Sequence, residues 1–231
     1  MKKISTYISE KLKIGTAKQQ YSYSPVSKYQ LSYMISDHIA AQGPNADMND
    51  IDVSKIDDMS FMFKKNDPEQ IRNIDVSEWN VSNVKNMTGI FSQLKHFNSD
   101  LSDWDMSKVK DSSYMLFGCV EFDGDISKWN MSNVNDTSNM FNLCKKFNSD
   151  ISKWNVHELR YAEHMFNGCE SFNQDLSEWD VSNLYDGRCM FKDCKSFNQD
   201  LDKWNVKNLH NMKYMFMKCE SLKKLHTWYK A

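Results

Sequence analysis

The sequence contains little of what enzymes, membrane proteins and nucleic-acid-binding proteins usually need. Its 231 residues include only seven glycines and three prolines, and no phosphate-binding glycine loop is present. The 29 basic and 31 acidic side chains nearly cancel, which leaves no electrostatic footprint for nucleic acid or an anionic membrane. No apolar run approaches the length of a membrane span. We therefore expect neither nucleic-acid binding nor membrane insertion.

The N-terminal residues and the cysteines exclude further classes. Residues 1–14 have early lysines but no apolar core or small-residue cleavage site, so we expect no classical secretion signal. The six cysteines include no Cys-x-x-Cys pair, which argues against a zinc site. No serine or cysteine stands beside an oriented base, so the sequence predicts no catalytic residues, no metal site, no cofactor and no enzymatic activity.

A 25-residue repeat organises the rest of the chain. Its landmarks are columns of Trp, Phe, Met and Cys: Trp79, Trp104, Trp129, Trp154, Trp179 and Trp204; Phe97, Phe122, Phe147, Phe172 and Phe197; Met115, Met140, Met165, Met190 and Met215; Cys119, Cys144, Cys169, Cys194 and Cys219. A unit this short cannot bury its own apolar face, so such a period indicates stacked units. We expect the column cysteines to be free and buried, and Cys189, outside the column, to be more exposed.

Spacing within the repeat predicts the shape of each coil. Trp179 and Val181 are two apart, as inward-facing residues of a strand are, and Met190 and Cys194 are four apart, as on a helical turn. We therefore predict an α/β repeat solenoid similar to leucine-rich repeats. Seven coils would form a parallel sheet on one face and short helical turns on the other, and an N-terminal helix would cap them.

Four segments follow from this pattern. Residues 1–24 would form a leader helix, over 3–13, and a flexible linker. Residues 25–46 would form the N-terminal cap, with a helix over 27–42 that has apolar residues on one face. The repeats would occupy 47–221, and 222–231 would cap the C-terminal end.

The repeat resembles a known family. The run FNQDLSEWDVSN over residues 172–183, followed by Met190, Phe191 and Cys194, resembles the BspA-type leucine-rich repeat, in its mycoplasma-lipoprotein-like branch. The resemblance covers Asp47 to about Ser221 and implies a leucine-rich-repeat solenoid with a role in binding or adhesion. The missing signal peptide makes the chain similar to phage- or prophage-encoded members, which implies a location in the host cytoplasm or the virion.

One aspartate precedes an inward apolar residue in each coil. The column is Asp47, Asp75, Asp100, Asp125, Asp150, Asp175 and Asp200. We interpret these carboxylates as acceptors for backbone N–H groups in turns. Calcium binding is the alternative, but β-roll calcium sites use a glycine-rich nonapeptide that is absent here.

The residues beside the inward Trp and Val columns should face outward. We predict that they bind a partner: Lys128, Asn130, Lys153, Asn155, His157, Glu178, Asp180, Lys203, Asn205 and Lys207. Repeat proteins use such extended surfaces for binding, although alternating charges on a solvated face would look the same.

Together these patterns predict a non-enzymatic interaction module that binds a protein or a glycan. The alternative is a structural or packaged phage virion component, with residues 1–14 as a docking or address helix. That helix could also mediate self-association.

Overall fold

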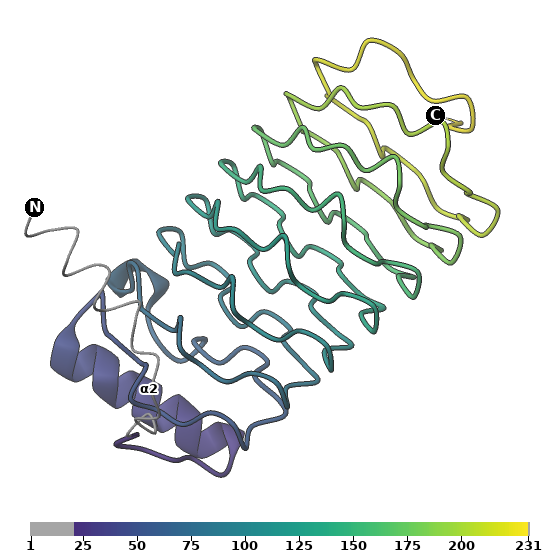
Figure 1. Ribbon diagram of the computed structural model, residues 1–231. Coiled ribbons are helices and arrows are strands. Elements are labelled where there is room, and N and C mark those ends of the chain that lie inside the picture. The colour runs from purple at the N-terminus through teal and green to yellow at the C-terminus, as the bar shows by residue number, and fades with distance from the viewer. Residues whose placement is uncertain (1–20, 231) are drawn as a thin grey trace, which may run out of the picture.

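The computed structural model describes residues 21–230 as an elongated stack of coils (Figure 1). The predicted leader helix and its docking role lie outside the described residues. Neighbouring coils pair through isolated parallel bridges between equivalent residues. From Asn86 onward the bridged partners are Asp111, Asp136, Tyr161, Asp186 and Asn211, each 25 positions after the one before. The sequence repeat is therefore the step from one coil to the next.

The predicted parallel sheet does not form. Within residues 21–230 all bridges are isolated, and no strand is present. The coils also lack the predicted short helices. The helical elements of this range are α2 (Lys28–Gln42) and the 3₁₀ helix η1 (Pro68–Gln70). The prediction of an α/β leucine-rich-repeat-like solenoid, with a sheet on one face and helical turns on the other, is wrong.

Turns replace the strands because acidic and amide side chains interrupt every coil. In the coil that begins near Asp175, the side-chain oxygen of Asp175 accepts the N–H of Ser177 at 2.9 Å, and Asp180 and Asp186 accept from residues two positions ahead at 3.0 and 2.9 Å. Such Asx turns redirect the backbone. Three of them in 25 residues leave segments shorter than a usual strand.

The segment expected to be a helical turn contains left-handed residues instead. Cys189 has a φ of 55° and Asp193 a φ of 57°, a conformation that a right-handed helix cannot include. The N–H groups of these two residues bind carbonyls of the next coil, at Lys213 and Met217. The N–H of Lys192, between them, binds the Cys189 carbonyl of its own coil. Over residues 187–193, every second backbone N–H therefore donates to a carbonyl of the next coil.

The columns of the repeat form the core. Trp154 and Trp179 stack with ring centroids 6.3 Å apart, and Phe147 and Phe172 with centroids 5.8 Å apart. The column cysteines Cys119 to Cys194 are fully buried, and their thiols donate to backbone carbonyls of the preceding coil, as Cys144 does to Leu116 at 3.0 Å. The stacked columns therefore form one continuous apolar core.

Helix α2 covers the N-terminal end of the stack (Figure 1). Ser27 caps it by accepting the N–H of Gln30, and Gly43 ends it with a φ of 85°. Leu31 and Ile35 are buried in the core, as expected for the predicted helix over 27–42. No helix within the described residues is long and apolar enough to cross a membrane.

Two residues expected in the linker belong to the stack. Tyr23 forms a parallel bridge with Ile51, and the N–H of Ser22 binds the carbonyl of Asp50 at 2.9 Å. At the other end, Trp228 stacks on Trp204 with ring centroids 6.0 Å apart. The core thus continues into the residues after the last regular repeat.

Candidate recognition face

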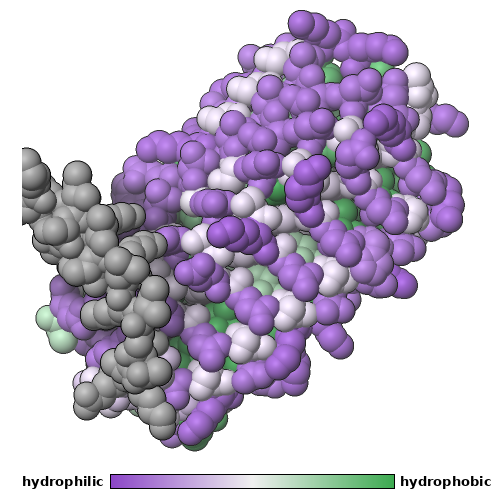
Figure 2. All heavy atoms as spheres, viewed as in Figure 1, coloured by the Kyte–Doolittle hydropathy of each residue, from purple (hydrophilic) through white to green (hydrophobic). Residues whose placement is uncertain are grey.

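The outward-facing residues of the coils form a mainly polar surface. Figure 2 shows one side of the molecule as largely hydrophilic, with hydrophobic side chains scattered between polar rows. The predicted ligand-facing residues alternate with buried core residues and are exposed, except His157, which is half-buried. Their positions are Lys128, Asn130, Lys153, Asn155, His157, Glu178, Asp180, Lys203, Asn205 and Lys207. We call this set the polar row.

Several side chains of the polar row have structural roles. The side-chain oxygens of Asn130, Asn155, Asp180 and Asn205 accept the N–H group two residues ahead, at 3.0 to 3.4 Å. These four residues therefore hold turns. Glu178 and Lys203 form an ion pair at 2.8 Å between neighbouring coils, which is too exposed to stabilise the fold much. Lys128, Lys153 and Lys207, which form no such ion pair with another described residue, are thus the members freest to meet a partner.

The coils also form an exposed aromatic cluster that the sequence patterns did not predict. Tyr185 is 49% exposed, its ring centroid lies 4.8 Å from that of His210, and Tyr161 contacts it edge-on with centroids 6.3 Å apart. Tyr185 and His210 occupy one column in adjacent coils, where the N–H of His210 binds the Tyr185 carbonyl at 3.0 Å. We call Tyr161, Tyr185 and His210 the aromatic cluster. Their spacing along the repeat was the available signal.

The aspartate column forms turns, as the structural interpretation predicted. Asp125 and Asp150 each accept a serine N–H at 2.9 Å. The hydrogen bonds from the backbone N–H and side chain of that serine lower the pKa of both carboxyl groups. These hydrogen bonds give the aspartate column a structural role in the turns.

A ladder of side chains, asparagine in most coils, joins neighbouring coils. Asn148 accepts the N–H of Asn173 at 2.9 Å, and Asp123 accepts that of Asn148 at 2.9 Å. Asp123 therefore continues the asparagine ladder, because a carboxylate accepts as an amide oxygen does.

The cysteines offer no activated nucleophile within the described residues. Burial raises the pKa of Cys169 well above its ordinary value, and it raises the pKa of Cys219 to about 12. Cys189, at 6% exposed, is more exposed than the four column cysteines Cys119 to Cys194 but less than Cys219 at 9%, and it too is buried. Protonated buried thiols are poor nucleophiles.

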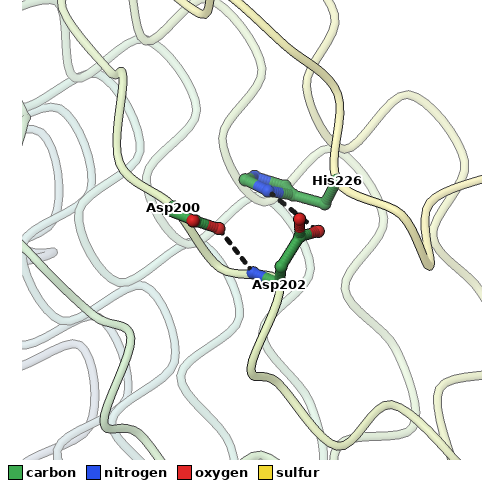
Figure 3. A group of neighbouring side chains, drawn as sticks. All are labelled: Asp200, Asp202 and His226. Carbon is green, nitrogen blue, oxygen red and sulfur yellow. Dashed lines mark hydrogen bonds and ion pairs between the residues drawn. The ribbon is translucent and has the colours of Figure 1, made fainter.

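Asp200, Asp202 and His226 come together at the C-terminal end (Figure 3). They border a hollow of about 160 Å³, and the sequence analysis did not single them out as a group. Asp202 accepts the N–H of Thr227 at 2.6 Å, and Nδ1 of His226 accepts that of Leu201 at 3.4 Å. Burial lowers the pKa of His226. Because these atoms already accept protein hydrogen bonds, the group fastens the C-terminal segment to the preceding coil.

Comparison with known proteins identifies the family. The family described as "Mycoplasma protein of unknown function, DUF285" matches residues 29–142 and 117–228. The chain belongs to the DUF285 family. No curated protein and no solved structure matches the chain. The matches span the coils and α2, so the resemblance to mycoplasma repeat proteins is confirmed at the level of this family.

Proposed function

We propose that this DUF285 protein is a non-enzymatic recognition module that binds a protein or a glycan. The binding surface would be the polar row together with the aromatic cluster. The aromatic cluster is the observation that supports the proposal best. Tyrosine is enriched among the residues that dominate binding, because its ring offers a large apolar contact and its hydroxyl a hydrogen bond.

The geometry of the coils suits such a role. Each coil holds its outward side chains at a fixed spacing, because its backbone is hydrogen-bonded to the neighbouring coil. The N–H of Tyr185, for example, donates to the Arg160 carbonyl of the preceding coil at 2.9 Å. A partner would therefore meet a preorganised surface, which lowers the entropic cost of binding. Exposed lysines of the polar row would supply orientation, and Lys153 and Lys207 are the candidates.

We also propose that the repeat belongs to the BspA-type branch. The run over residues 172–183 with Met190, Phe191 and Cys194 supports this assignment. The resemblance implies binding or adhesion, which agrees with the role proposed for the aromatic cluster.

The test compares two double variants of the full chain on a glycan array and in a host-proteome pull-down. Tyr161→Ala with Tyr185→Ala removes the aromatic cluster. Tyr29→Ala with Tyr33→Ala is the matched control, because both tyrosines are exposed on α2 at the far end of the stack. Equal thermal unfolding of both variants and the parent must be shown first.

We expect the first variant to bind its identified glycan or protein at least about tenfold more weakly, since losing an aromatic anchor costs more than about 1 kcal/mol. The control should bind as the parent does. Unchanged binding by the first variant, or equal loss in both variants, would place recognition elsewhere. The array and the pull-down together distinguish a glycan from a protein partner.

A further inference from the structure

The C-terminal end of the stack leaves a row of backbone donors open. In the preceding coil, the N–H groups of Gly187, Cys189, Phe191 and Asp193 donate to carbonyls of the last regular coil at 2.8 to 3.0 Å. The equivalent donors one repeat later belong to Met212, Tyr214, Phe216 and Lys218. The backbone of Phe216 faces the Tyr229 hydroxyl, whose pKa is raised by burial and lowered by backbone hydrogen bonding at Phe216 and Met215. Among residues 21–230, no backbone carbonyl accepts the other three. We call residues 212–218 the C-terminal edge.

The opposite end of the stack is closed. There α2 covers the segment that corresponds to the C-terminal edge: Lys28 pairs with Asp58 at 3.2 Å, and Asn66 donates to the hydroxyl of Ser36 at 3.2 Å. The two ends are therefore unlike. Because α2 occupies its own end, a second copy of this chain could not continue the stack head to tail without displacing the helix.

An apolar hollow adjoins the C-terminal edge. It measures about 350 Å³ and is lined by Lys213, Tyr214, Phe216, Met217, Leu225 and Tyr229. Tyr214 is 48% exposed and Leu225 50% exposed. Open backbone donors beside apolar side chains are the two elements by which proteins bind an extended peptide. The main-chain bonds give affinity and the side-chain hollow gives selectivity.

Charge indicates which peptide would fit. Residues 203–230 contain seven lysines, one glutamate and no aspartate or arginine, a formal charge of +6, whereas the remaining residues sum to −8. Lys213 lies within the C-terminal edge, and Lys230 follows Tyr229, which packs edge-on against Phe216 with ring centroids 5.1 Å apart. Such asymmetry attracts a partner of opposite charge and suppresses a basic one.

We propose that the C-terminal edge binds an extended acidic segment of a partner protein. The segment would lie along residues 212–218 as one further turn of the stack. Its carbonyl oxygens would accept the N–H groups of Met212, Tyr214 and Lys218, its apolar side chains would fill the hollow, and its carboxylates would face Lys213 and Lys230. This surface is separate from the aromatic cluster and does not depend on the function proposed for it.

The probe for the test is a fluorescein-labelled peptide of about ten residues in which glutamate and valine alternate, long enough to span the edge in extended form. Its control is the same peptide with lysine in place of glutamate. Fluorescence anisotropy measures binding to the full chain at low and high salt. Hydrogen exchange with mass spectrometry measures protection of residues 212–218.

We expect the acidic peptide to bind, to bind more weakly as salt rises, and to slow exchange over residues 212–218 at least about tenfold, as new hydrogen bonds to these amides require. The lysine peptide should not bind. Lys213→Glu with Lys230→Glu should weaken binding at least about tenfold, which corresponds to about 1.4 kcal/mol. The matched control, Lys55→Glu with Lys110→Glu, makes the same change in net charge at two exposed lysines outside both proposed surfaces and should bind as the parent does.

Three results would overturn the proposal. One is an acidic peptide that does not bind. Another is binding without protection of residues 212–218, or equal loss of binding in both lysine variants, which would indicate a general charge effect. The last is sedimentation that shows a dimer whose interface protects 212–218 in the absence of peptide, which would make a second copy the occupant.

Discussion

Trp154 and Ile126 are joined across two neighbouring coils by a buried hydrogen bond. The indole N–H of Trp154 donates to the carbonyl oxygen of Ile126 at 3.0 Å, and Trp179 does the same with Ile151 at 3.0 Å. The tryptophan column therefore serves two purposes. Its rings fill the core, and its indole N–H is satisfied by a carbonyl of the preceding coil that also accepts a backbone N–H of its own turn, as Ile126 does from Trp129 at 3.2 Å.

Substitution of Trp154 by phenylalanine should separate these purposes. The phenyl ring keeps part of the stack but loses the volume of the second indole ring and one of the two hydrogen bonds to the Ile126 carbonyl, which still accepts the N–H of Trp129 at 3.2 Å. We expect a loss of about 2 kcal/mol or more in the free energy of unfolding, measured by urea denaturation. Tyr29→Phe, on an exposed face of α2, is the control and should change stability by less than about 0.5 kcal/mol. If Trp154→Phe is as mild as the control, the hydrogen bond does not stabilise the fold.

Gly89 tests the left-handed positions of the coils. It has a φ of 56°, and a Cβ there would overlap the ring of Phe61. Gly118 also has a positive φ, 74°, but a Cβ there would make only ordinary contacts, the nearest at 3.5 Å. We expect Gly118→Ala to cost about 1 kcal/mol through the backbone alone, and Gly89→Ala to cost at least about twice as much.

A double-mutant cycle with Phe61→Ala isolates the overlap at Gly89. In the Phe61→Ala background, the cost of Gly89→Ala should fall to that of Gly118→Ala, because only the backbone strain is left. Thermal or urea unfolding measures all four proteins. An unchanged cost in that background would mean that Phe61 moves aside freely.

We expect replacement by asparagine to have opposite effects on stability at Asp136 and at Asp150. Both accept a serine N–H, at 2.8 and 2.9 Å, and hold Asx turns that asparagine could also hold. Burial raises the pKa of Asp136, with Asp111 and Glu163 adding to the effect. The backbone N–H of Ser152 lowers the pKa of Asp150. At pH 7, Asp136→Asn should therefore stabilise the protein and Asp150→Asn should destabilise it.

The effects of Asp136→Asn and Asp150→Asn on stability should both become smaller as pH falls. A raised carboxyl pKa costs stability as pH rises through the folded-state value, so the advantage of Asp136→Asn should vanish in acid, where the parent carboxyl is protonated. A lowered pKa contributes stability that is lost as pH falls through the folded-state value, which for Asp150 lies below that of an ordinary aspartate, so the deficit of Asp150→Asn should be reduced at about pH 3.5 but not yet abolished. Both differences should stay below about 1 kcal/mol, because water screens partly exposed charges. Urea unfolding at pH 7 and at about pH 3.5 measures them, and equal effects of both variants would contradict the assignment.

The sequence alone determined the repeat and its interior. A fixed step of 25 residues returns the same side chains to the same place, so the Trp, Phe, Met and Cys columns had to be buried, and they are. The roles of the Asp125 column and of the helix over 27–42 also followed from local chemistry, since turn acceptors and caps act on residues only two or three positions away.

Only the tertiary structure decided how the coils are joined. Trp179 and Val181 are spaced as in a strand, but turns at Asp175, Asp180 and Asp186 leave no segment long enough for one. The spacing of Met190 and Cys194 suggested a helix, yet left-handed residues in that segment exclude it. At Cys189 and Asp193 the positive φ accompanies hydrogen bonds to the next coil. The local sequence does not show which residues form such bonds. The aromatic cluster and the C-terminal edge arose in the same way, from residues that only stacking brings together.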